Sequence, residues 1–191
     1  MSFGAVANED SWTLKQLMGQ LSEVRYARLS FIETKQAMFL TSDLVIEGNM
    51  EYRAPGYLEK VTVSPVNEKV VVDGDSMTVE KMTITGKHAG TLQKQYYSIQ
   101  SHPALQAAVG GIRAVLAGNY ETLDQNYLVE INGKREDWTL KLVPKSAEIS
   151  AYVEKILLSG KEASILTYVT IQPDGDESVM HLTYQEIHKG L

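Results

Sequence analysis

The chain has 191 residues, and 18 Lys and Arg against 24 Asp and Glu give it a formal net charge of −6 at pH 7. This length suits one domain, and 43% hydrophobic with 22% charged residues is typical of a folded globular protein, which excludes disorder as its main character. The acidic balance argues against nucleic acid as a partner, and no apolar run is long enough for a membrane-spanning helix.

The first predicted element is an amphipathic helix over residues 11–27, because apolar side chains recur there at helical spacing. The segment 1–9 before it contains Ala5-Val6-Ala7, which has the small-x-small form of a signal-peptidase site. We therefore expect residues 1–9 to be a disordered remnant of a signal peptide and residues 10–191 to form a single domain.

From about Leu29 the apolar pattern changes to a period of two, which is typical of strands with one buried face. The dipeptide Asp73-Gly74 predicts a tight hairpin, and Pro55-Gly56 separates two earlier strands. The strands predicted in this part of the chain are residues 46–52, 57–63, 70–72 and 76–81.

A second helix is predicted over residues 102–117, with Pro103 in its first turn and Gly118-Asn119 as its stop. Strands follow, with turns at Asn132-Gly133 and Asp174-Gly175, and a short turn or helix begins at Pro144. These later strands are residues 127–131, 138–142, 153–159, 164–172 and 178–188.

Recurrent hairpin signals and the absence of βαβ spacing predict an α+β protein built on one antiparallel sheet. Two to three helices would cover this sheet, and a sheet of so many strands normally curls.

The sequence offers no pattern that supports catalysis. It has no cysteine, and His88, His102, His181 and His188 show no metal-ligand spacing. Neither a Gly-x-Ser-x-Gly nucleophile motif nor a phosphate-binding glycine loop occurs, and Asp73 is better explained as a turn residue than as a catalytic acid. We therefore expect no enzymatic activity, no cofactor and no metal.

The apolar faces of the predicted strands and helices either pack into a filled core or line a cavity for a ligand. Met and Tyr are frequent on these faces and adapt to irregular surfaces, which favours a cavity. Gly110-Gly111 weakens the second helix, which indicates close approach to the sheet or movement. The candidate cavity residues are Ile46, Met50, Tyr52, Val61, Val63, Met77, Val79, Leu140, Leu142, Val169, Ile171, Met180, Leu182 and Tyr184. The candidate lid residues on the two helices are Leu17, Leu21, Val24, Leu105, Val109, Ile112 and Leu116.

The order and spacing of several motifs resemble the LolA family of periplasmic carriers of outer-membrane lipoproteins. The resemblance runs from about residue 10 to 188. The motifs are Glu33-Thr34-Lys35-Gln36, Glu47-Gly48-Asn49-Met50-Glu51-Tyr52 with Pro55, Val70-Val71-Val72-Asp73-Gly74, Leu140-Lys141-Leu142-Val143-Pro144-Lys145 and Asp174-Gly175-Asp176.

This resemblance implies an unclosed half-barrel whose mouth is covered by helices, with a hydrophobic cavity that receives acyl chains of a lipoprotein or another lipid. It also implies an inner-membrane donor and an outer-membrane acceptor as partners, and a monomeric carrier without covalent chemistry. One position departs from the family: the Arg that usually precedes the second-strand proline and helps to hold the lid is Ala54 here. Arg53 is adjacent, but alternation along a strand would point it to the other face. The alternative function is a lipid-sensing or protein-interaction module on the same fold.

Overall fold

The computed structural model describes residues 12–82 and 90–190, so the predicted N-terminal remnant at residues 1–9 lies outside the described part. Within these residues the strands form one eleven-stranded antiparallel sheet in the order β6-β5-β4-β3-β2-β1-β11-β10-β9-β8-β7. The first and last strands of the described chain therefore pair with each other at the centre. The remaining strands extend from this pair in two meanders.

The elements follow the predicted course of the chain, with four helices among the described residues. The strands are β1 (Val24–Gln36), β2 (Leu44–Arg53), β3 (Tyr57–Ser64), β4 (Glu68–Asp73), β5 (Ser76–Met82), β6 (Leu92–Ser98), β7 (Tyr127–Lys134), β8 (Asp137–Pro144), β9 (Lys155–Lys161), β10 (Ser164–Ile171) and β11 (Glu177–Lys189). The helices are α1 (Leu14–Ser22), α2 (Pro103–Leu116), α3 (Tyr120–Asn126) and α4 (Ala147–Ser150).

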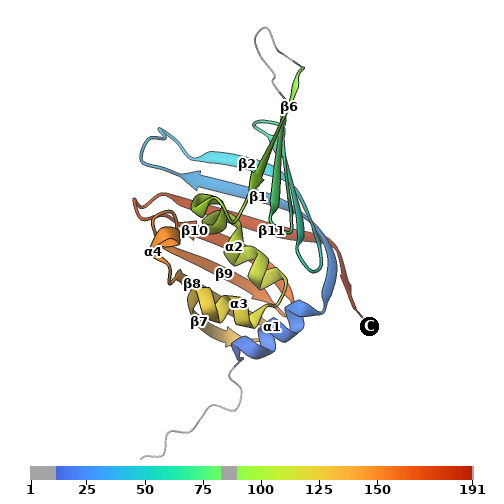
Figure 1. The fold of residues 1–191 in the computed structure, drawn as a ribbon. Helices are drawn as coiled ribbons and strands as arrows, with labels where there is room; N and C mark the ends of the chain where they lie inside the picture. The colour runs from blue at the N-terminus through green and yellow to red at the C-terminus, as the bar shows by residue number, and fades with distance from the viewer. Residues whose placement is uncertain (1–11, 83–89, 191) are drawn as a thin grey trace, which may run out of the picture.

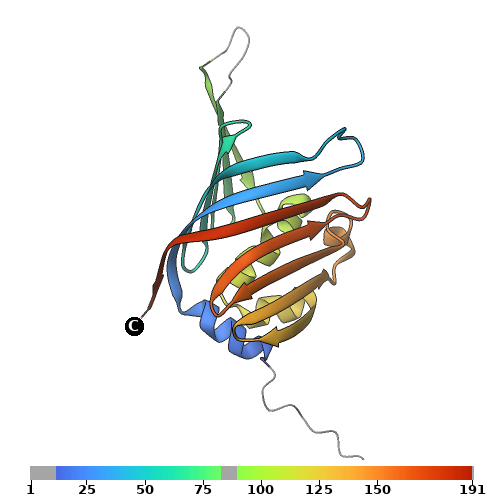
Figure 2. The same cartoon turned by 180° about the vertical axis from the view of Figure 1, so that it is seen from behind.

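The sheet curves strongly, and all four helices lie on its concave face (Figure 1). Seen from behind, the convex face carries strands only; β2 runs alongside β1, and β3 to β6 rise steeply away from the rest (Figure 2). Since β6 and β7 stand at the two ends of the strand order and do not pair with each other, the barrel is unclosed. The prediction of an α+β half-barrel covered by helices is confirmed; α4 corresponds to the short turn or helix predicted to begin at Pro144, and α3 is an additional short helix.

The first helix is shorter than its predicted span of residues 11–27. It begins at Leu14 and is capped by Thr13, whose hydroxyl accepts a hydrogen bond from the Gln16 backbone while the Gln16 side chain accepts one from the Thr13 N–H. It ends at Ser22, and Val24 is already the first residue of β1. The correction has a simple cause: Val24 continues the helical spacing and also starts the alternation of the strand, so the pattern alone does not locate the boundary.

Two hairpins that the sequence predicts are confirmed. Asp73 pairs with Ser76 around Gly74, which has φ +56, and β10 and β11 are joined around Gly175, which has φ +90. Glycine fits both turns because other residues pay a steric penalty at positive φ.

The predicted turn at Asn132-Gly133 is wrong. The strand β7 continues to Lys134, and Gly133 pairs with Trp138, so the connection to β8 is made by residues 135 and 136. Gly133 has φ +97, and a Cβ there would lie 2.2 Å from the Asp137 carbonyl oxygen, so this glycine permits a close contact inside the ladder instead of a turn. The elements β6 and α3 are further findings that the sequence did not predict.

The helices pack most tightly over β8, β9 and β10. Trp138, Leu142, Ile156 and Ile165 have no exposed surface there. Gly111 of α2 permits this approach, because a Cβ at that position would lie 2.7 Å from Ile156 Cδ1. Close packing of α2 on the sheet therefore explains this glycine.

Candidate functional site

A cavity of about 770 Å³ lies between the concave face of the sheet and α2. Its walls come from β1 to β4 on one side and from β10 and β11 on the other, with Val153 closing it beside α4. Such a volume falls within the range of ligand-binding pockets in proteins. Among the described residues, no group of three or more metal-ligating side chains could hold a metal ion.

The deep part of the cavity is apolar. Met50 of β2, Leu58 of β3 and Val72 of β4 form its floor, and Ala107 and Ile112 of α2 form its roof. The floor residues lie on the same face because β2, β3 and β4 are in register at this point, where Tyr52 pairs with Leu58 and Leu58 pairs with Val72. Apolar walls of this kind bind hydrocarbon by removing its surface from water.

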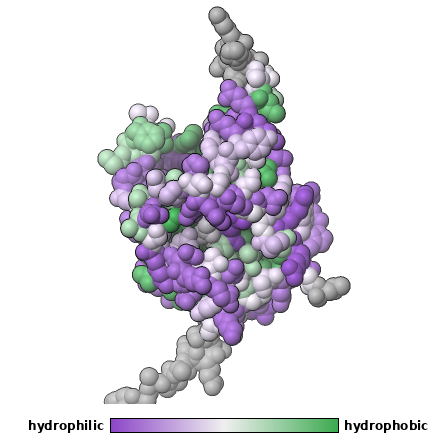
Figure 3. Space-filling view, in the orientation of Figure 1, coloured by the Kyte–Doolittle hydropathy of each residue, from purple (hydrophilic) through white to green (hydrophobic). Residues whose placement is uncertain are grey.

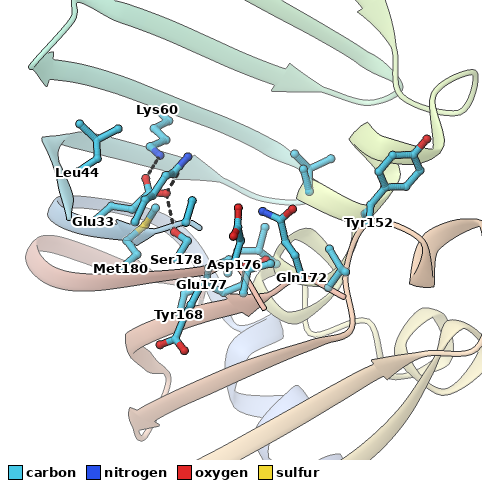
Figure 4. A pocket seen from close by; sticks show the side chains of 18 of the residues that line it. Glu33, Leu44, Lys60, Tyr152, Tyr168, Gln172, Asp176, Glu177, Ser178 and Met180 are labelled. Atoms are coloured by element: carbon cyan, nitrogen blue, oxygen red, sulfur yellow. Dashed lines mark hydrogen bonds and ion pairs between the residues drawn. The ribbon is translucent and has the colours of Figure 1, made fainter. Parts of the chain in front are cut away.

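A polar cluster is built into the same wall, closer to the ends of β1 and β11. Glu33 is 4% exposed, and its carboxylate accepts hydrogen bonds from Lys60 Nζ at 2.5 Å and from Ser178 Oγ at 2.7 Å. Lys35 Nζ lies 3.4 Å from the same carboxylate. The cluster joins β1, β3 and β11 across the cavity wall (Figure 4). We call Glu33, Lys35, Lys60 and Ser178 the polar cluster.

The cluster keeps Glu33 ionised. Burial alone would raise the pKa of this carboxyl, but the charge and hydrogen bond of Lys60, the charge of Lys35 and the Ser178 hydroxyl together lower it below 4.5. Lys60 also lies over the Phe31 ring, with Nζ 4.6 Å from its centroid. Phe31 has room because Gly48 stands opposite it, where a Cβ would lie 2.8 Å from Phe31 Cε1.

A tyrosine hydroxyl adds an unpaired donor to the lining. Tyr168 of β10 lines the cavity, and its buried hydroxyl has no hydrogen-bond partner within the described part of the chain. Burial raises the pKa of Tyr168 to about 12, so the hydroxyl remains protonated at neutral pH. A buried hydroxyl without a partner is costly, and a ligand acceptor would relieve that cost.

The cavity is bordered at the ends of the strands by the β1–β2 loop (residues 37–43) and the β10–β11 turn (residues 172–176), which we call the mouth. The two segments are tied together, since the Met38 N–H donates to Asp176 Oδ1 at 3.0 Å. Asp174 also lines the cavity here, and its carboxylate accepts a hydrogen bond from the Asp176 N–H. The mouth is therefore acidic.

The mouth also has an apolar rim. Met38 is 86% exposed and Phe39 is 82% exposed, while Phe39 and the half-exposed Tyr152 both line the cavity entrance. In Figure 3 an apolar cluster protrudes over the β1–β2 loop, beside a hollow in the surface. Large apolar side chains exposed together at a cavity entrance are typical of a surface that meets an apolar partner.

The predicted site residues fall into three groups. Five of them line the cavity, and they come from β2, β11 and α2. These are Met50, Met180, Leu182, Val109 and Ile112.

A second group belongs to the hydrophobic core outside the cavity lining. The strand residues of this group are Ile46, Tyr52, Met77, Val79, Leu140, Leu142 and Tyr184. The predicted lid residues of this group are Leu17, Leu21, Val24, Leu105 and Leu116. The helix α1 therefore contributes to the core, and the cavity is roofed by α2.

The third group does not line the cavity, because the neighbouring residues of the same strands do. In β3 the cavity residues are Leu58 and Lys60, and in β10 they are Tyr168 and Thr170. Since successive side chains of a strand point to opposite faces, the other set faces away from the cavity. This set is Val61, Val63, Val169 and Ile171.

The polar cluster was missed in the sequence, although Glu33 and Lys35 belong to a motif that was recognised. The alternation of buried Leu29 and Phe31 continues through Glu33, which places this carboxylate on the concave face. This alternation is the signal in the sequence that places Glu33 on the concave face.

The position of Ala54 leaves the β2–β3 turn without an arginine directed at the helices. Arg53 forms an ion pair with Glu51 of the same strand and lies over the Tyr57 ring, 5.0 Å from its centroid. A different arginine approaches this turn from the helix side, because a Cβ at Gly56 would lie 3.2 Å from an Arg113 guanidinium nitrogen.

A curved, unclosed antiparallel sheet with helices and a cavity on its concave face defines the half-barrel class of fold. The sequence matches the family model of LolA-like outer membrane lipoprotein carrier proteins over residues 5–183. The chain belongs to this family. No helix in the described residues is long and apolar enough to span a membrane.

Solved structures with a similar course of the chain have low sequence identity to it. A LolA superfamily protein from Nitrosomonas europaea is 9% identical with a TM-score of 0.47, and 94% of each chain is covered. A complex of MucA and MucB from Pseudomonas aeruginosa gives 11% identity and a TM-score of 0.43, with 93% of this chain and 56% of that chain covered. A DUF1329 family protein from Desulfovibrio piger gives 8% identity and a TM-score of 0.35, with 93% and 91% covered. The curated protein sequences contain no match to this chain.

Proposed function

We propose that this protein is a periplasmic carrier that binds the acyl chains of a lipoprotein or another lipid in the cavity under α2. It would take its cargo from an inner-membrane donor and pass it to an outer-membrane acceptor, as a monomer and without covalent chemistry. The observation that carries the proposal is an apolar cavity of about 770 Å³ that reaches the surface at a mouth with exposed apolar side chains. Membership of the LolA-like family supports it.

The physical chemistry of transport suits this cavity. Each buried CH₂ group gains about 0.8 kcal/mol on leaving water, so an acyl chain binds through the apolar floor and roof. The cargo must also leave again, and a roof made by a single helix satisfies both needs, because α2 can shift its packing when cargo enters. Entry at the mouth would bring the chain first against Phe39 and then against the deeper apolar wall.

Uptake of a fluorescent fatty acid by the purified full chain tests this proposal. We expect saturable binding with one probe per chain, displacement by an unlabelled fatty acid, and transfer of the probe from donor to acceptor vesicles in proportion to protein concentration. Organic extraction followed by mass spectrometry would identify lipid that co-purifies. A protein that takes up no probe and carries no extractable lipid would contradict the carrier proposal.

The second candidate function is a lipid-sensing or protein-interaction module. It is favoured by exposed apolar side chains on the convex side of the sheet, where Ile32 of β1 is 51% exposed and Val45 of the adjacent β2 is 47% exposed. Replacement of both by Ser distinguishes the candidates. If the protein is a carrier, the double variant keeps its probe uptake and vesicle transfer. If it is an interaction module, the double variant loses a co-purifying protein, and neither the variant nor the unmodified protein transfers the probe between vesicles.

A further inference from the structure

We propose that the preferred cargo is an aminophospholipid or its single-chain form, whose zwitterionic head has a phosphate next to the acyl glycerol and an ammonium at its outer end. This inference rests on the proposed carrier function and names the chemistry of the cargo. Three layers of the cavity support it, namely an apolar interior, a layer with excess positive charge, and an acidic mouth.

The strand register gives the order of these layers. Along β1, Glu33 pairs with Met180, and the next inward residue, Lys35, pairs with Ser178. One step further the strands end, and the β10–β11 turn with Asp174 and Asp176 follows. The apolar floor lies in the opposite direction along the strands. A ligand that enters tail first therefore comes to rest with its acyl chain on the apolar floor. The polar atoms next to the chain then lie at the polar cluster, and the outer end of the head group lies at the acidic mouth.

The polar cluster has more positive than negative charge. The ammonium groups of Lys35 and Lys60 share the single carboxylate of Glu33, which also receives the Ser178 hydroxyl proton. One positive charge of this group is thus left without a partner inside the cluster. A phosphate accepts charge-assisted hydrogen bonds from ammonium groups, and such bonds are stronger in a partly dehydrated cavity than in water. The unpaired hydroxyl of Tyr168 is a further donor on the adjacent strand.

The mouth has the opposite charge. Asp174 and Asp176 line the cavity entrance, and Glu177 follows them at the start of β11. These carboxylates repel a head group whose only charge is the negative charge of a phosphate. They attract a head group that also has an ammonium a few bonds beyond the phosphate, on the side away from the acyl chain. The acyl chain, phosphate and ammonium of an aminophospholipid therefore follow one another in the same order as the apolar, positive and negative layers of the cavity. A fatty acid or a phosphatidylglycerol matches only the first two, and a glyceride only the first.

Binding of three single-chain lipids with the same palmitoyl tail tests the inference on the full chain. They are lysophosphatidylethanolamine, lysophosphatidylglycerol and monopalmitoylglycerol, each titrated below its critical micelle concentration and measured by displacement of the fluorescent fatty acid. We expect the affinity to fall in the order lysophosphatidylethanolamine, lysophosphatidylglycerol, monopalmitoylglycerol, with about tenfold between the two phospholipids, as one charge-assisted contact predicts.

Two variants test which part of the head group each of the two charged layers contacts. Lys35→Met removes a half-exposed ammonium and should reduce the affinity for both phospholipids, while the affinity for monopalmitoylglycerol stays unchanged. Asp174→Asn with Asp176→Asn retains acceptor oxygens at the mouth and should make the two phospholipids bind equally. Lys141→Met is the matched control, since Lys141 pairs with Glu130 on the face of β8 opposite the buried Leu140 and Leu142.

The outcomes separate this inference from the carrier function. Equal affinity for the three lipids, or tighter binding of lysophosphatidylglycerol, overturns the aminophospholipid inference and leaves the carrier proposal standing. Loss of head-group preference in Lys141→Met as well as in Lys35→Met also overturns it, because the effect would then come from net charge. Failure of all three lipids to bind contradicts the carrier proposal itself.

Discussion

The two halves of the sheet use their apolar residues in different ways. Under α2 and α3, the half formed by β7 to β9 and the start of β10 is filled, with Leu142, Ile156 and Ile165 fully buried. The half formed by β2 to β4 is open, and its inward residues Met50, Leu58 and Val72 line the cavity. We expect the filled half to contribute most of the stability of the fold, while the open half leaves room for a ligand. The hydrophobic content of 43%, ordinary for a globular protein, is thus divided between a core and the lining of a cavity.

Matched leucine truncations should separate the filled half from the open half. Leu142→Ala leaves a void in a close-packed region, and we expect it to reduce the free energy of unfolding by about 3–5 kcal/mol. Leu58→Ala only enlarges a cavity that already exists, so its cost should be about 1–2 kcal/mol. Urea denaturation measures both. Equal costs would show that the region around Leu58 is as tightly packed as the core.

A charge placed in the roof of the cavity should affect binding much more than the same charge elsewhere. Ile112→Asp puts a carboxylate against the apolar floor, and since desolvation of a charge without a partner is costly, we expect fatty-acid affinity to fall at least tenfold. Leu128→Asp is the control, because Leu128 is 61% exposed and does not line the cavity. Probe titration of both folded variants is the measurement, and equal losses would show that the cavity assignment is wrong.

The polar cluster predicts a pH dependence of stability. The pKa of Glu33 in the folded protein lies below its ordinary value of 4.5, so the ionised carboxylate stabilises the fold above pH 4.5. This stabilisation is lost as the pH falls through the folded-state pKa. Glu33→Gln should therefore cost about 1–3 kcal/mol at pH 7, and the difference from the unmodified protein should shrink toward pH 3.

The control for this effect is Glu130→Gln, which changes a carboxylate that is 64% exposed and paired with Lys141. Unfolding curves at several pH values should show little difference between this variant and the unmodified protein. A pH-independent loss in Glu33→Gln would mean that the carboxylate contributes packing only.

A pair of adjacent glycines in α2 tests how closely this helix packs on the filled half. Gly111→Ala would place its Cβ 2.7 Å from Ile156 Cδ1, and we expect a loss of about 1–2 kcal/mol in stability. Gly110→Ala meets only the Tyr127 hydroxyl at 3.3 Å and gains helix propensity, so its effect should be within about 0.5 kcal/mol of zero. Thermal unfolding distinguishes them, and a neutral Gly111→Ala would contradict the close packing of α2.

Much of the fold could be predicted from the sequence, because hairpin turns and alternation are local signals. Asp73-Gly74 and Asp174-Gly175 mark tight turns directly, and the central strands have a clear period of two. The helix α3 was missed because its seven residues lie directly after α2 and contain one buried side chain, Leu123. The strand β6 was missed because most of its residues are exposed, which leaves no alternation to detect.

The inward face of β10 could not be predicted, because phase along a strand depends on tertiary pairing. The pairing of β10 with β9 shifts by one residue between Ile165 and Thr167. Such an irregularity exchanges the two faces of a strand, so Ile165 is buried and then Tyr168 and Thr170, instead of Val169 and Ile171, reach the cavity. The contact between Lys60 and Glu33 joins residues 27 positions apart, which no local pattern reveals.

The central claim is that the open half holds an acyl chain while the filled half does not. A fatty acid with a nitroxide spin label near its terminal methyl group, added to protein with isotope-labelled Ile, Leu, Val and Met methyl groups, tests this claim directly by NMR. We predict strong broadening of the methyl resonances of Met50, Val72 and Ile112, and little broadening of those of Leu142 and Ile156. Broadening of the two groups to the same degree, or of neither, would contradict the account.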